Sequence, residues 1–208
     1  VSRSRLLQLA LPLVKEYGFT RETLARSALE WPQQPHTQPL SESAVSTLFG
    51  EGDAARRTLI GAWLEEGQIQ MRAQPVSNVK DALNNRLRYN EPVLPLLPEA
   101  FALLASPKYG LPPFDVRPAL RHATSIADEA CHLANDASTG TSWYARRATL
   151  AAIYTAAGKH FSKLHQLTSP RSAPDFLESL LTTANETELF SRYIMKSWAG
   201  IIKSSGVF

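Results

Sequence analysis

The sequence contains a single cysteine, Cys131, and lacks several other features that mark large classes of protein. One cysteine rules out a framework of internal disulfides and fits a reducing compartment. No apolar run approaches the roughly 20 residues that a membrane-spanning helix needs. There is no phosphate-binding glycine loop and no nucleophilic serine elbow. A formal net charge of +3 over 208 residues is too small to indicate a nucleic-acid partner by itself.

The residues that are present indicate a helical protein. With 44% hydrophobic and 20% charged residues, the composition is that of a folded chain and not of a disordered one. Apolar residues recur at helical spacing along most of the sequence, and we find neither strand-like alternation nor an internal repeat. The sequence therefore predicts an all-α fold.

The first fifty residues resemble the helix-turn-helix of TetR-type repressors. One helix is expected to end at Gly18, a second to be capped by Thr20, and a third to start at Ser41 or Ser43. A DNA-reading version joins its last two helices by roughly three to four residues, whereas this chain carries the proline-bearing insertion EWPQQPHTQPL. The third helix also has no Arg, Lys, Asn or Gln to contact DNA. We therefore predict the shape without DNA function; the alternative is a TetR-like transcription regulator that binds a hydrophobic effector.

Glu129 and His132 form a Glu-x-x-His unit of the type that di-iron helical bundles use. Such a site needs two of these units and two further glutamates, and the sequence has no second unit. We therefore expect a solvated helix face bearing Asp128, Glu129 and His132, with no metal and no catalytic residue. Cys131 has no strongly basic neighbour in sequence and is expected to be a small core or interface residue. A metal-dependent oxygenase would require bound iron in the purified protein.

The last helical segment, TELFSRYIMKSWAGIIKSSG, has a broad apolar side and a narrow basic strip. Such a helix suits the surface of an anionic membrane. It is equally compatible with a helix that docks on the main body or on a second copy of the chain. The apolar residues are Leu189, Phe190, Tyr193, Ile194, Trp198, Ile201 and Ile202.

The segment ANDASTGTSWYARRATLAAIY resembles the ninth Coq protein family of ubiquinone (coenzyme Q) biosynthesis. NNRLRYNEPVLPLLPEAFALLA and LALPLVKEYGFTRETLARSAL are similar to other segments of that family, so the likeness covers most of the chain. It implies a TetR-like, all-helical, lipid-binding accessory protein that forms a homodimer, is not an enzyme, and needs no cofactor besides a bound isoprenoid quinone or phospholipid. It further implies a peripheral location on the matrix side of the mitochondrial inner membrane. The first residues are too short to be assigned as a targeting peptide.

The resemblance implies partners and sites as well. The partners are the di-iron demethoxyubiquinone hydroxylase, to which the lipid is presented, and other Coq biosynthetic proteins. The docking surface includes Trp143 and Tyr144, and we add Asp128 and Arg147, because Arg147 lies three to four residues from both rings and can stack on either. The alternative is that Trp143 packs inside and Arg147 covers it. A lipid cavity is expected from helical faces that carry Leu83, Leu87, Leu94, Leu97, Phe101, Ile126, Ala130, Leu150, Ile153 and Tyr154.

The chain departs from the family pattern beside this surface. Gly140 stands where an acid is expected, and Asn135 replaces a glycine. Cys131 and Leu133 stand where larger aromatic residues are expected. The predicted organisation is a degenerate helix-turn-helix part (1–71), a lipid-binding and partner-docking part (76–170) and a membrane-associating helix (175–208).

Overall fold

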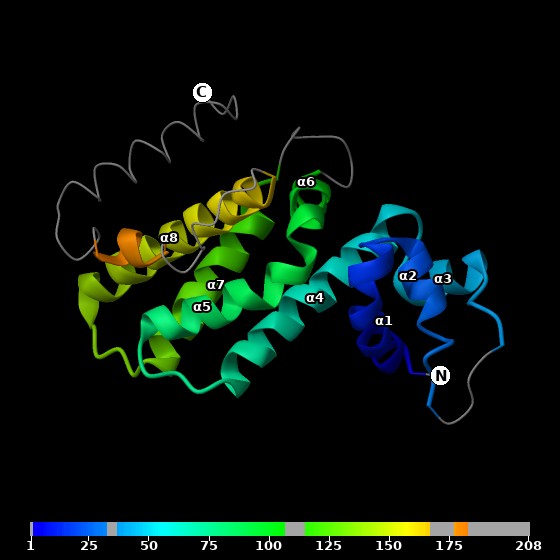
Figure 1. Ribbon diagram of the computed structural model, residues 1–208, viewed down its shortest axis with the longest axis horizontal. Helices are drawn as coiled ribbons and strands as arrows, with labels where there is room; N and C mark the ends of the chain where they lie inside the picture. The colour runs from blue at the N-terminus through cyan, green and yellow to red at the C-terminus, as the bar shows by residue number, and fades with distance from the viewer. Residues whose placement is uncertain (1, 33–36, 107–114, 167–176, 183–208) are drawn as a thin grey trace. The chain divides into compact units, whose positions relative to one another are not determined.

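The computed structural model describes residues 2–32, 37–106, 115–166 and 177–182. Every regular element in these ranges is helical (Figure 1), which confirms the predicted all-α class. The likeness to TetR stays a prediction. In chain order the elements are α1 (Arg3–Tyr17), α2 (Arg21–Arg26), α3 (Glu42–Phe49), α4 (Asp53–Ala73), α5 (Val79–Asn90), the 3-10 helix η1 (Glu91–Leu96), α6 (Leu97–Ala105), α7 (Arg117–Leu133) and α8 (Gly140–Gln166). Residues 177–182 are helical as well.

The chain divides into two compact units. Unit 1 comprises residues 1–69 and 90–104, and unit 2 comprises residues 70–89 and 105–208. The segment 90–104 therefore belongs with the N-terminal helices, although the sequence-based division grouped it with the central part. Helix α4 contributes residues to both units.

The ends of the N-terminal helices follow local capping chemistry. Gly18 ends α1 with a positive φ of 69°, which glycine adopts without steric cost. The side chains of Thr20 and Ser41 accept hydrogen bonds from the backbone N–H groups of Thr23 and Ala44 at the starts of α2 and α3. These three predicted helix ends are confirmed.

In unit 1, residues 27–41 separate α2 from α3, so the long connection predicted from the sequence is present. Arg21 at the start of α2 links this helix to α3 by hydrogen bonds. Its guanidinium donates to the Glu42 carboxylate at 2.6 Å and to the Ser46 hydroxyl at 2.8 Å. It also reaches the Gly50 carbonyl at 3.3 Å. Arg21, a side chain of the kind that binds DNA phosphates, is thus already bound to α3. The absence of a DNA-binding function stays a prediction.

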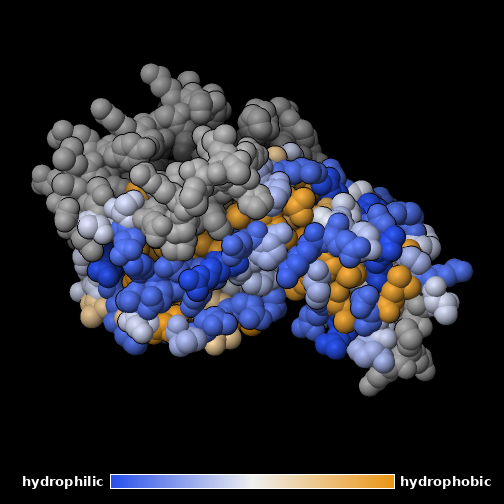
Figure 2. Space-filling model, in the orientation of Figure 1, coloured by the Kyte–Doolittle hydropathy of each residue, from blue (hydrophilic) through white to orange (hydrophobic). Residues whose placement is uncertain are grey.

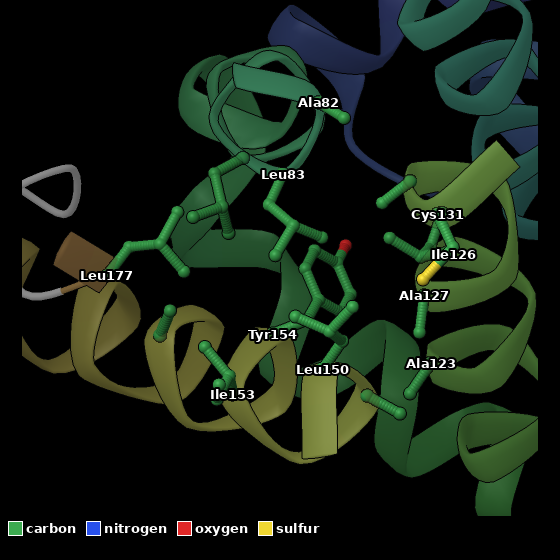
Figure 3. Packing of buried hydrophobic residues seen from close by; sticks show 14 of the residues in the cluster. Ala82, Leu83, Ala123, Ile126, Ala127, Cys131, Leu150, Ile153, Tyr154 and Leu177 are labelled. Carbon is green, nitrogen blue, oxygen red and sulfur yellow. The ribbon is translucent and has the colours of Figure 1, made fainter. Parts of the chain in front are cut away.

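Unit 2 is built around one apolar cluster from α5, α7, α8, Met71 at the end of α4 and Leu177 (Figure 3). Side chains from these elements point toward one another, and the ring of Tyr154 lies near the middle of the group (Figure 3). Helix α7 contributes Ala123, Ile126 and Ala130, which recur at helical spacing on one face and are all buried. Ala119 lies in the first turn of α7, beyond the end of the cluster, and is exposed.

A polar group lies against this cluster. His122 of α7 contacts the ring of Tyr154 edge-on, with 6.1 Å between ring centroids. Arg86 of α5 is completely buried, and its guanidinium carbon lies 5.5 Å from the centroid of the Tyr89 ring. Burial, together with the positive charge of Arg86, lowers the pKa of His122 to about 3. His122 is therefore neutral in the folded protein at physiological pH.

The depressed pKa of His122 predicts a loss of stability in mild acid. An unfolded histidine has a pKa near 6.5, so the unfolded state binds more protons than the folded state between about pH 3 and pH 6.5. The contribution of neutral His122 to the free energy of unfolding is complete above about pH 6.5 and falls by about 1.4 kcal/mol per pH unit below it. Between pH 7 and pH 5, His122→Gln should lose about 2 kcal/mol less unfolding free energy than the wild type in denaturant titrations. His132→Gln, an exposed position on the same helix, is the control. Equal losses for the two variants would contradict the assignment.

Candidate functional site

The start of α8 carries an exposed pair of aromatic side chains. The described surface visible in Figure 2 is largely hydrophilic, with smaller hydrophobic patches. Among the described residues, the exposed large hydrophobic side chains are Ile69, Val116, Trp143 and Tyr144, and only the last two are neighbours. Trp143 is 36% exposed and Tyr144 is 70% exposed. The alternative in which Trp143 packs inside is therefore wrong.

Arg147 fixes the orientation of this pair. Its guanidinium carbon lies 3.9 Å from the centroid of the Trp143 ring, which confirms the predicted stacking between positions i and i+4. The Trp143 and Tyr144 rings meet edge to face, with 4.7 Å between centroids. Arg147 Nε donates to Asp128 Oδ1 on α7 at 2.6 Å. Its side chain is only 13% exposed, so the cation forms the floor of the pair and not its outer surface.

The end of α7 supplies the second anchor for this arginine. The N–H groups of Asn135 and Asp136 bond back to the carbonyls of His132 and Cys131 at 3.1 and 2.9 Å. This is the Schellman arrangement, which requires a left-handed residue at the first position after the helix cap. Asn135 occupies that position with a φ of 52°, and asparagine tolerates it better than other non-glycine residues. An asparagine at this position is therefore compatible with the turn.

Asp136 is the centre of the network below the aromatic pair, and its carboxylate is 7% exposed. It accepts a short hydrogen bond from the Ser138 hydroxyl. It also lies 3.2 Å from Arg146 Nε and 3.6 Å from Arg147 Nη1. The sequence assigned no role to Asp136, Ser138 or Arg146. The Asn-Asp pair that follows the C-cap residue of α7 is the signal that marks the turn, but the contact with α8 depends on the chain reversal that follows.

The charges of this network balance. Two arginines, at positions 146 and 147, face two aspartates, at positions 128 and 136. The Ser138 hydroxyl, helped by Arg146 and Arg147 and opposed by burial, lowers the pKa of Asp136 below its ordinary value, so the carboxylate is ionised at neutral pH. Because the cations are neutralised within the chain, the surface offers aromatic contact area rather than net charge. Exposed aromatic side chains held in place by an arginine are typical of the anchors of protein interfaces.

The predicted lipid-lining residues do not lie in one place. The structure brings seven of them together in the cluster of unit 2, where they pack against one another: Leu83, Leu87, Ile126, Ala130, Leu150, Ile153 and Tyr154. Leu94, Leu97 and Phe101 belong to unit 1. The apolar pattern along each helix predicts correctly that most of these residues are buried. It does not predict in which of the two units a residue is buried.

A cavity of about 620 Å³ lies at one edge of the unit 2 cluster. It is bordered by the start of α5, the first half of α8 and the helical residues 177–182. Two of the predicted lining residues, Leu150 and Ile153, reach it, together with Lys80, Arg146 and Glu178. The volume falls in the range of small-molecule sites.

The Glu-x-x-His unit differs from its expected environment. The Glu129 side chain is only 14% exposed, and its carboxylate lies 2.6 Å from Arg72 Nη2 of α4, so it does not belong to a solvated face. An arginine 57 residues away in sequence covers it, which spacing within one helix cannot predict. Asp128 and His132 are exposed, as expected. Within the described ranges, no group of three His, Cys, Asp or Glu residues is arranged to hold a metal ion.

Cys131 is buried in the unit 2 cluster, which confirms its expected place in the core. Burial raises the pKa of its thiol, so the reactive thiolate is disfavoured. The seven predicted membrane-binding residues between Leu189 and Ile202 lie outside the described residues. Of the helices that are described, none combines the length and the apolar character needed to cross a membrane.

Comparison with known proteins gives one consistent result. The family model of COQ9 matches residues 116–187, which include all of α7 and α8. The chain is 32% identical to the Bos taurus protein named "Ubiquinone biosynthesis protein COQ9, mitochondrial" over 168 residues, which cover 72% of this chain and 47% of the relative. The Homo sapiens protein of the same name is 31% identical, with 72% and 47% covered. That of Drosophila melanogaster is 27% identical, with 90% and 56% covered. The chain spans about half the length of the curated relatives it matches.

Proposed function

This chain belongs to the COQ9 family, and from that premise we propose that it acts in ubiquinone biosynthesis as a lipid-binding accessory protein. In this proposal it binds isoprenoid quinone intermediates at the membrane and presents them to the di-iron demethoxyubiquinone hydroxylase. The names of these relatives give a biosynthetic role without a reaction. We accordingly assign the chemical step to the hydroxylase and the delivery of its substrate to this chain.

The aromatic pair at the start of α8 carries the proposal. Trp143 and Tyr144 expose apolar area that the described residues leave uncovered. Arg147, which is itself held by Asp128, keeps the Trp143 ring in one orientation. A side chain that is rigid before binding loses little conformational entropy when a partner covers it. The charge-neutral floor supports a contact with a complementary apolar patch on the hydroxylase, rather than with an oppositely charged surface.

Binding of an isoprenoid tail requires only that its hydrocarbon be buried in an apolar site. Each methylene group moved from water into an apolar site contributes about 0.8 kcal/mol, so an isoprenoid tail needs no polar partner along its length. The apolar cluster of α5, α7 and α8 supports such a site because its side chains can form one wall of it.

The relatives are named mitochondrial, and the proposed location of this chain is the matrix face of the inner mitochondrial membrane. The C-terminal residues between Leu189 and Ile202 would insert their apolar side among the lipids. A homodimer and contacts with other Coq proteins complete the proposal.

Native mass spectrometry of the purified protein, followed by lipid extraction, tests the lipid-binding step. We expect a co-purifying isoprenoid quinone, and transfer of demethoxyubiquinone from liposomes to the protein. Replacement of Trp198 and Ile201 with lysine should abolish the transfer, because two charges on the apolar side oppose membrane insertion. Ile69→Lys, which adds a charge at an exposed position elsewhere, should leave transfer unchanged. A ligand-free protein that takes up no quinone would contradict the proposal.

A further inference from the structure

A second cavity, of about 280 Å³, lies wholly within unit 1. It is bordered by the end of α1, the turn into α2, the first turn of α4 and residues of the segment 96–100. Its volume falls just below the roughly 300 Å³ at which small-molecule sites begin. The cavity therefore suits one large side chain of another protein better than a whole small-molecule ligand.

Part of the lining of this pocket is apolar and firmly packed. Phe19 and Ala100 are buried, and Leu96 is partly buried. The Phe19 ring packs edge-on against Trp63 of α4, with 5.9 Å between ring centroids. Such a surface suits the methylene stem of a long basic side chain, which buries its hydrocarbon and keeps its charged end in contact with polar groups.

The pocket also carries two carboxylates from different helices. Glu16 lies in the last turn of α1 and Glu99 in the first turn of α6, and both are exposed. A hydrogen bond with the Glu16 carboxylate raises the pKa of the neighbouring Tyr17 phenol, so Glu16 lies beside a neutral donor. Arg26 covers the Tyr17 ring but is paired with Glu22 at 2.8 Å, so its charge is already balanced.

Arg56, the cation that lines the pocket, is held by partners of its own. Its Nε donates to the Phe19 carbonyl at 3.0 Å, and its Nη1 donates to Asp53 at 3.3 Å. Its Nη2 makes a short hydrogen bond to Glu99 Oε1. A carboxylate has about four acceptor positions, so Glu99 can bind a second guanidinium and keep Arg56. With Glu16 beside it, the pocket retains an excess of negative charge, to which the C-terminal end of α1 adds.

The composition of unit 1 has the same sign. Unit 1 contains ten acidic and seven basic residues, whereas the whole chain contains 19 and 22. The positive net charge of the chain therefore belongs to unit 2. An acidic unit attracts basic partners and repels acidic ones, so charge complementarity selects a cationic occupant for the pocket.

We propose that this pocket is a docking site for an arginine side chain in a basic segment of a partner protein. The stem packs on Phe19 and Leu96, and the guanidinium donates to the carboxylates of Glu16 and Glu99. Arginine suits the site better than lysine because its planar guanidinium has five donors and can bridge two carboxylates. The pocket belongs to unit 1, whereas the aromatic pair and the apolar cluster belong to unit 2, so the inference does not depend on the lipid-binding function.

Titration of the full chain with a blocked alanine peptide that carries one central arginine tests the site. The backbone amide signals of Gly18 and Thr20, which both line the pocket, report binding in NMR spectra. We expect these signals to shift and to saturate. The same peptide with citrulline, a neutral side chain of the same shape, should bind at least about tenfold more weakly. Equal binding of the two peptides would overturn the proposal.

Paired variants separate the pocket from the general charge of unit 1. Replacing both Glu16 and Glu99 with glutamine should weaken binding of the arginine peptide at least about tenfold. The matched control replaces Glu51 and Glu65 with glutamine, two exposed carboxylates of unit 1 that do not line the pocket, and should leave the affinity within about twofold. Equal weakening by the two double variants would reduce the effect to attraction by an acidic surface and would overturn the docking site.

A further variant tests the pocket itself. Leu96→Trp keeps both carboxylates and fills the space between them, and it should also weaken binding of the arginine peptide. Unchanged binding by this variant would place the arginine outside the pocket and contradict the assignment.

Two other occupants are distinguished by separate measurements. Butylguanidinium carries the charged end and the stem without a peptide, and binding of it that is tighter than that of the peptide would make the pocket a small-molecule site. Sedimentation velocity should show the same oligomeric state for the wild type and the Glu16/Glu99 variant. Loss of self-association in that variant would assign the pocket to a second copy of this chain and overturn docking of a different partner.

Discussion

Replacing Trp143 and Tyr144 together with alanine is expected to weaken binding of the demethoxyubiquinone hydroxylase at least about 100-fold, with only a small loss of thermal stability. Buried aromatic anchors at interfaces each contribute about 2 kcal/mol or more, which corresponds to roughly 30-fold in affinity, and contacting anchors are not additive. The loss of stability should be small because Tyr144 is 70% exposed before binding, and Trp143, which is 36% exposed, gives up mainly its stacking on Arg147. Calorimetric titration of the purified hydroxylase with each variant measures the effect.

The control for this experiment removes apolar area elsewhere. Val116 and Ile69 are the other exposed large hydrophobic side chains among the described residues, and replacing both with alanine should leave the affinity within about twofold. Because the network below the aromatic pair carries no net charge, affinity should also change little between low and moderate salt. Hydroxylase affinity that is equal for the two double variants would contradict the docking assignment.

Ile126→Ala is expected to lower the free energy of unfolding by about 2–5 kcal/mol. Ile126 is completely buried between the helices of unit 2, so its truncation removes apolar contacts and leaves a cavity that the surrounding side chains fill only in part. Denaturant unfolding of the ligand-free protein, followed by circular dichroism, measures the change. The result decides whether this side chain belongs to a packed core or to an open lipid cavity.

The same substitution at Ile69 provides the reference. Ile69 lies on α4 and is exposed, so its replacement by alanine should change the unfolding free energy by less than about 0.5 kcal/mol. If Ile126→Ala costs as little as Ile69→Ala in the ligand-free protein, Ile126 faces an empty cavity and the packing described above is wrong.

Local interactions are the part of the fold that the sequence predicts well. Gly18, Thr20 and Ser41 cap helices through contacts that span no more than four residues, and each was predicted. The stacking of Arg147 on Trp143 follows from positions i and i+4 on one helix in the same way. Such contacts depend on the chain geometry alone, so no knowledge of the tertiary structure is needed.

Contacts between helices are the part that the sequence does not predict. Asp136 reaches Arg146 and Arg147 only because the turn after α7 brings α8 back beside it. Arg72 covers Glu129 across the space between α4 and α7. His122 has an ordinary sequence context, and its depressed pKa arises from burial beside Arg86 of another helix.

The predicted lipid-lining residues fall in two units, and the sequence does not predict this because it depends on contacts between helices. Leu94 and Leu97 are three residues apart and Leu83 and Leu87 are four, which are both helical spacings, but the first pair lies in unit 1 and the second in unit 2. Apolar periodicity reports that a helix face is buried and does not report what it packs against. The sequence predicts Leu150 and Ile153 as cavity-lining residues, but it does not predict that Lys80 and Arg146 border the same cavity, because these two come from distant parts of the sequence.

The most direct test of the account is the rate at which the hydroxylase converts demethoxyubiquinone in liposomes, with and without this chain. The account predicts that the wild-type chain and the Val116/Ile69 control variant accelerate conversion, and that the Trp143/Tyr144 variant does not, although it still takes up the quinone. Acceleration by the Trp143/Tyr144 variant equal to that of the wild type, or no acceleration by the wild type, would contradict presentation of the substrate through the aromatic pair.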